Sequence, residues 1–106
     1  MAYKVLGQSN PSATTATTLY TVPAASSAVV STISVCNQAS TAATFRIAVR
    51  PAGAALAAQH YIVYGATVPA SDTTMLTVGL TLAATDVITV YASSATMSFN
   101  AYGSEA

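Results

Sequence analysis

The stretch TFRIAVR, residues 44–50, alternates between apolar and polar side chains. Its three large apolar residues fall on one side of an extended chain, and Arg46 and Arg50 fall on the other. Successive side chains of a β-strand point to opposite faces, so a period of two indicates a strand with one buried face. A shift of one residue would expose that face to water, which fixes the register of the strand.

The same alternation recurs in four further segments, at residues 29–37, 75–82, 88–92 and 97–102. In the first of these segments we expect Val29, Ile33 and Val35 to share the buried face. Weaker strand patterns occupy residues 3–7, 19–22 and 60–68.

Turn-forming residues separate these segments, so strands recur about every 10–15 residues, as in all-β sandwiches and barrels. We therefore predict an all-β fold: a single small antiparallel β-sandwich spanning residues 1–106, either Ig-like or jelly-roll-like, with a closed barrel as the alternative. Residues 51–59 are rich in alanine, but Gly53 interrupts a segment that is already too short for a stable helix. We expect a loop there with room for one helical turn.

The charge content is unusually low and restricts the possible partners. Only 6% of the residues are charged, 53% are hydrophobic, and the net charge is zero. Nucleic-acid binding requires clustered Lys and Arg, and the sequence holds three such residues. A neutral surface is better suited to burial in an assembly than to a free monomer, which usually stays soluble through its net charge. We expect a homo-oligomer or a larger assembly.

Neither a membrane nor an export pathway is indicated. No segment approaches the ~20 apolar residues of a spanning helix, and eight strands of about 10 residues, as in the smallest transmembrane β-barrels, would use nearly the whole chain. The N-terminal residues contain no signal-peptide core. We expect synthesis in a cytosol.

Catalytic and metal-binding patterns are not recognisable either. The single histidine, His60, has only Asp72 and Asp86 as possible partners, and each aspartate precedes a strand, where capping a turn is its usual role. The single cysteine, Cys36, lies in a strand-like run, where we expect a small buried apolar residue. We predict no catalytic residue, no cofactor and no metal.

Arg46 and Arg50 are the most specific feature of the surface. Strand geometry puts them on one face, about 13 Å apart. They either anchor acidic or carbonyl groups of a neighbouring protein or simply keep the strand solvated. Tyr61 and Tyr64 belong to a strand nearby in sequence, and tyrosine is common both in strands and at protein interfaces. These four residues form the predicted interface.

Five segments carry a family resemblance: YKVLGQSNPSATTATTLYTVPA (residues 3–24), VVSTISVCN (29–37), FRIAVRPAGA (45–54), HYIVYG (60–65) and ITVYASSATMSFNAYGSE (88–105). In these segments, nearly the whole chain resembles a group of short β-rich proteins encoded by tailed bacteriophages, including cyanophages. Proteins of this group are described as virion structural proteins, and the resemblance transfers no catalytic or ligand motif.

The resemblance implies a place on the virion, after synthesis in the host cytoplasm. One possibility is a capsid decoration (cement) protein, often trimeric, which clamps subunits of the major capsid protein. The other is a tail, baseplate or fibre component that contacts tail proteins or the host.

Overall fold

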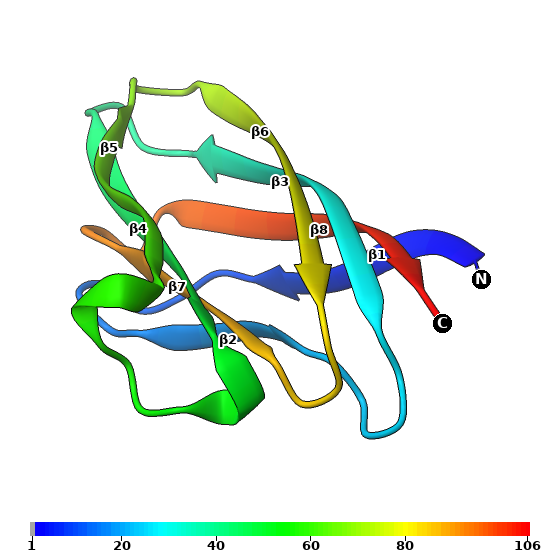
Figure 1. The fold of residues 1–106 in the computed structure, drawn as a ribbon. Coiled ribbons are helices and arrows are strands. Elements are labelled where there is room, and N and C mark those ends of the chain that lie inside the picture. Colours follow the sequence, from blue (N-terminus) through cyan, green and yellow to red (C-terminus); the bar gives the residue numbers. More distant parts are fainter. Residues whose placement is uncertain (1) are drawn as a thin grey trace.

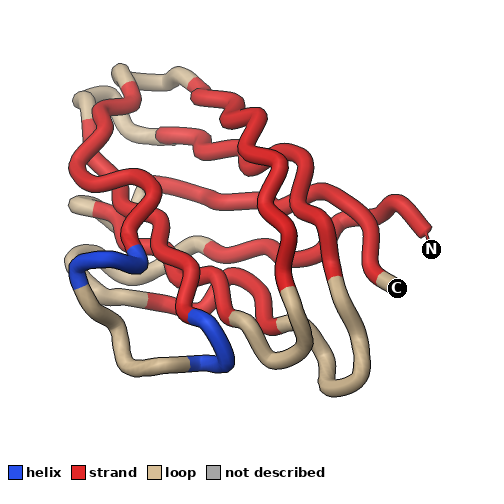
Figure 2. Tube along the Cα trace, viewed as in Figure 1, coloured by secondary structure: helices blue, strands red, loops and turns tan. Residues whose placement is uncertain are grey.

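The computed structural model describes residues 2–106 and contains eight β-strands (Figure 1). They are β1 (Ala2–Ser9), β2 (Thr17–Thr21), β3 (Ala28–Asn37), β4 (Ala43–Arg50), β5 (Tyr61–Val68), β6 (Thr73–Leu82), β7 (Val87–Ala92) and β8 (Met97–Glu105). Every segment predicted as a strand lies largely in one, and Figure 2 shows strands joined by loops and two short helical turns. The predicted loop after β4 carries two single 3-10 turns, η1 (Pro51–Gly53) and η2 (Ala58–His60).

The strands form two four-stranded antiparallel sheets packed face to face. The first sheet has the order β1-β8-β3-β6 and the second has the order β2-β7-β4-β5. The strands pair in nested order along the chain, beginning with the first and the last. β1 pairs with β8, β2 with β7, β3 with β6, and β4 with β5. An antiparallel ribbon rolled up in this way is the jelly-roll arrangement of a β-sandwich. The prediction of a sandwich is thus confirmed, in its jelly-roll form.

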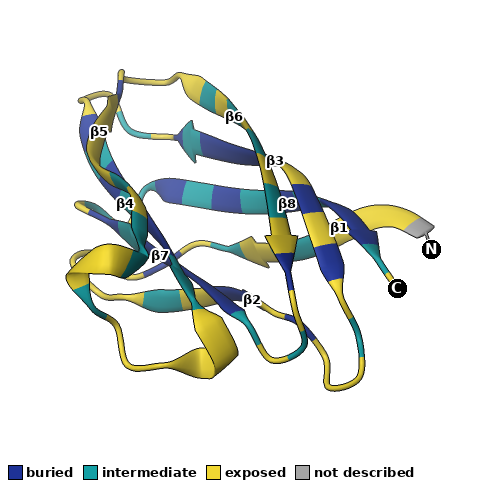
Figure 3. Ribbon diagram, in the orientation of Figure 1, coloured by how far each residue is buried: buried dark blue, intermediate teal, exposed yellow. Residues whose placement is uncertain are grey.

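The hydrophobic core fills the space between the two sheets, and Figure 3 shows burial alternating along the central strands. Phe45 of β4 and Phe99 of β8 meet across the core, with ring centroids 6.1 Å apart and an edge-to-face angle of 67°. Around them pack aliphatic side chains from both sheets, including Ile33, Ile47 and Ile88, none of which is exposed.

One predicted core residue is wrong, and a β-bulge explains the error. Val29 is 37% exposed, whereas its neighbour Val30 is fully buried. In the pairing of β3 with β8, Val30 lies opposite Gly103 and Thr32 lies opposite Tyr102, so Ser31 is an extra residue in β3. A bulge inserts one residue and reverses the alternation beyond it. Val29 therefore faces outwards although Ile33 and Val35 face the core.

The same bulge explains why position 103 is a glycine. A Cβ atom built on Gly103 would lie 1.9 Å from the carbonyl oxygen of Val29. No side chain fits so close to a backbone oxygen, so only glycine allows β3 and β8 to pair here. Cys36 also departs from the prediction, because it is only half-buried and pairs with the outward-facing Ser98.

Candidate functional site

The outer surface of the second sheet gathers the predicted interface residues. The strand register places Tyr64 of β5 and Tyr91 of β7 on either side of Arg46 of β4. The Arg46 guanidinium carbon lies 4.2 Å from the centroid of each ring. A guanidinium group is attracted to the face of an aromatic ring, and here two rings hold it from both sides.

An irregularity in β5 at Ile62 brings Tyr61 to the same face as Tyr64. Residues three positions apart in a regular strand point to opposite sides. The register shifts between Val63 and Tyr61, which leaves Ile62 as an extra residue. Tyr61 therefore pairs with Ala48, next to Arg46 on the outward face, and its ring meets that of Tyr64 edge to face at 4.9 Å.

Arg50 lies on this outward face as well, but its donors are used within the chain. Its Nε donates to the Thr89 hydroxyl at 3.1 Å, and one terminal nitrogen donates to the carbonyl of Ala54 at 3.1 Å. The Asp86 carboxylate accepts the backbone N–H of Ala52 at 2.9 Å. Arg50 and Asp86 together hold the turn that follows β4.

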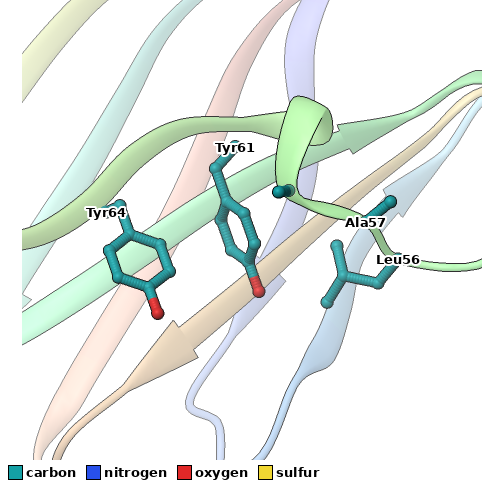
Figure 4. Close-up of a pocket in the computed structure, with 5 residues that line it drawn as sticks. Leu56, Ala57, Tyr61 and Tyr64 are labelled. Atoms are coloured by element: carbon teal, nitrogen blue, oxygen red, sulfur yellow. The ribbon is translucent and has the colours of Figure 1, made fainter.

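An open pocket of about 600 Å³ lies against Tyr61 and Tyr64. Leu56, Ala57, Ala58, Tyr61 and Tyr64 line it, and Figure 4 shows the two phenol rings and Leu56 side by side along its wall. Tyr64 is 65% exposed although it lies in a strand. We call Arg46, Tyr61, Tyr64 and Tyr91, with the Leu56 pocket, the Arg–Tyr face.

His60, Asp72 and Asp86 have structural partners. His60 Nδ1 accepts the N–H of Ala57 at 3.1 Å and so supports the loop beside the pocket. The Asp72 carboxylate accepts its neighbour's N–H, and Asp86 also accepts that of Ala83, which are the turn-capping roles predicted. Among residues 2–106 no cluster of His, Cys, Asp or Glu could hold a metal ion.

Lys4, Tyr20 and Glu105 form a second polar group at the end of β8. Lys4 Nζ lies 3.2 Å from Glu105 Oε1, and the Tyr20 hydroxyl donates to the other carboxylate oxygen. The hydrogen bonds from Tyr20 and Lys4 lower the pKa of Glu105. Burial, reinforced by the neighbouring carboxylate, raises the pKa of Tyr20.

The outer surface of the first sheet is chemically different from the Arg–Tyr face. Successive cross-strand rows on it are Tyr3–Ser104–Val29–Thr81, Val5–Tyr102–Thr32–Thr77, Gln8–Asn100–Ser34–Met75 and Ser98–Cys36–Thr73. None of these paired positions carries Lys, Arg, His, Asp or Glu. Tyr3 and Met75 are 89% and 60% exposed. We call this surface the uncharged face.

The structure thus brings Arg46, Tyr61 and Tyr64 together and gives Arg50 a mainly internal role. Sequence reasoning did not assign Tyr91 or Leu56 to the site. Alternation within residues 88–92 places Tyr91 opposite the apolar Ile88 and Val90, but its contact with Arg46 depends on the pairing of β4 with β7. That pairing is not visible in the sequence pattern.

Comparisons with protein-family models, with curated proteins and with solved structures gave no significant match. Within residues 2–106, the structure contains no helix with the length and hydrophobicity needed to cross a membrane.

Proposed function

We propose that this protein is a structural component of a tailed-phage virion, namely a capsid decoration protein that docks on the major capsid protein through its Arg–Tyr face. The observation that carries the proposal is the Arg46 side chain stacked between Tyr64 and Tyr91 beside an open apolar pocket. Tyrosine and arginine dominate the energetic centres of protein interfaces. In this proposal the protein acts by contact and performs no chemistry of its own.

The rigidity of this group favours binding. Docking usually costs the freedom of the side chains that it immobilises. Arg46 is already held between two rings, and Tyr64 is already in contact with Tyr61, so less freedom remains to be lost. The jelly-roll fold supports the proposal by analogy alone, because viral capsid domains and lectins both use it.

The uncharged face supports contacts between copies of the chain. Burying it requires no charged group to leave water, and two copies meet without like-charge repulsion. It also exposes the large apolar side chains of Tyr3, Val5 and Met75. We propose a homo-oligomer, with the trimer favoured by the resemblance to phage decoration proteins.

Quantitative mass spectrometry of purified virions tests the proposed location. A decoration protein is expected in hundreds of copies per particle, whereas a dozen or fewer would contradict that role and favour the tail. In particles complemented with Arg46→Ala/Tyr64→Ala, the copy number should fall while the isolated variant remains folded. Lys4→Gln, which removes a positive charge outside the Arg–Tyr face, is the matched control and should keep the wild-type copy number.

The alternative is a tail, baseplate or fibre module that touches the host or tail proteins. The Leu56–Tyr61–Tyr64 pocket favours it specifically, because exposed aromatic rings offer apolar surface to a sugar and hydroxyls at their edge. The isolated protein would then adhere to host cells at micromolar concentration, and Tyr64→Ala would abolish adherence. Absence of adherence by the wild type would count against this alternative.

A further inference from the structure

Arg46 is a fixed cation whose hydrogen-bond donors remain free. Both faces of its guanidinium are covered by rings at 4.2 Å. Its N–H groups make no hydrogen bond to any residue in the part of the chain that the structure describes, and no buried side-chain nitrogen there lacks a partner. The donor edge of Arg46 is therefore open to solvent.

No carboxylate of residues 2–106 is committed to neutralising Arg46. Glu105 pairs with Lys4, while Asp72 and Asp86 accept backbone N–H groups at turns. Arg50, four positions along the same strand, bonds to Thr89 and to the carbonyl of Ala54. The two arginines thus differ: Arg50 stabilises the fold, and Arg46 presents an unused charge.

We propose that Arg46 is the receptor for a carboxylate side chain of the docking partner, and that the adjoining pocket receives an aliphatic side chain next to it. A guanidinium offers parallel N–H donors that match the two oxygens of a carboxylate. Tyr64 belongs to both the carboxylate site and the aliphatic site, because its ring stacks on Arg46 and also lines the pocket with Leu56. The partner segment is therefore an acidic residue adjacent to an aliphatic one.

The stacked rings make this receptor selective for a planar anion. They hold the guanidinium plane in one orientation and keep water from its faces, so the interaction with a carboxylate is stronger than at an open surface. A lysine ammonium would supply the charge without the planar fork. This inference rests on the proposed function, since it names the chemistry by which the Arg–Tyr face would dock.

Titration of the ¹⁵N-labelled protein with blocked dipeptides tests the inference without a virion. The probe is acetyl-Glu-Leu-amide, its neutral control is acetyl-Gln-Leu-amide, and acetyl-Glu-Ala-amide tests the pocket. We expect acetyl-Glu-Leu-amide to shift the amide signals of β4 and β5 and to bind about tenfold or more tightly than the neutral control, as for a hydrogen bond to a charged group.

Variants of Arg46 separate the effect of its planar guanidinium donors from the effect of its positive charge. Arg46→Gln should remove the preference for the glutamate peptide, and Arg46→Lys should lose most of it. Lys4→Gln, with the same change in net charge outside the Arg–Tyr face, should keep it. Leu56→Ala, in an exposed loop, should bind the leucine and alanine peptides equally. The amide spectrum of each variant reports directly that it is folded.

Three results would overturn the inference. They are equal binding of the glutamate and glutamine peptides, wild-type binding by Arg46→Lys, and tighter binding of methyl glucuronide than of acetyl-Glu-Leu-amide. The last result would assign the carboxylate to an acidic sugar. None of these results bears on whether the protein is present in virions, whereas its absence from virions would overturn the proposed function and leave a measured carboxylate preference intact.

Discussion

Replacing Phe99 by alanine should remove a large part of the stability of this domain. The Phe99 side chain is fully buried, and its ring packs edge to face on Phe45 of the opposite sheet at 6.1 Å. Deleting a buried phenyl ring costs about 3–5 kcal/mol, from lost burial and from the cavity left behind. Small domains have about 5–15 kcal/mol in total. Phe99→Ala should therefore lower the free energy of unfolding by about a fifth or more.

Urea denaturation followed by circular dichroism measures this loss. With a slope of about 1.5 kcal/mol per M, the midpoint should fall by roughly 2–3 M. If Phe99→Ala leaves too little folded protein to measure, Phe99→Leu should still show a fall of about 1–2 kcal/mol. Met75→Ala, at an exposed site of the same sheet, is the control and should change stability by about 0.5 kcal/mol or less. A loss below about 1 kcal/mol for Phe99→Ala would refute the packing described between the sheets.

Three further changes test other parts of the fold. Gly103→Ala should destabilise by about 2 kcal/mol or more in the same assay, because its Cβ would overlap the carbonyl oxygen of Val29; an unchanged midpoint would contradict the bulge. Because the hydrogen bond from Tyr20 helps to lower the pKa of Glu105, the carboxylate stabilises the fold above its ordinary pKa, and this contribution is lost as the pH falls through the lowered value. Wild type should thus lose stability from about pH 5 downwards, and the Glu105→Gln variant should lose less over that range. Arg50→Gln should speed amide exchange in the turn after β4, with unchanged exchange in the core strands; protection equal to that of wild type would show that its hydrogen bonds do not hold the turn.

The fold is largely predictable because five segments alternate between apolar and polar residues, and turn-forming residues bound the three weaker ones. One position is an informative exception. The spacing of Val29 to Ile33 predicts a core position, but the extra residue Ser31 reverses the alternation of β3 where it pairs with β8. A bulge depends on the strands beside it, so the pattern of one strand does not reveal it.

Only part of the candidate site is predictable from the sequence, namely Arg46, Tyr61 and Tyr64, and its geometry is not. The outward position of Arg46 follows from alternation within β4. Its place between Tyr64 and Tyr91 requires β4 to lie between β5 and β7, which is a property of the whole topology. The shared orientation of Tyr61 and Tyr64 depends on the irregularity at Ile62.

We propose that the Arg–Tyr face makes the contact by which this protein joins a virion. Cryo-electron microscopy of virions that contain the protein would show this contact. We expect copies of the sandwich on the particle with the second sheet turned towards its neighbour and Arg46 against an acidic side chain. A sandwich whose second sheet faces solvent, with Arg46 uncovered, would contradict it.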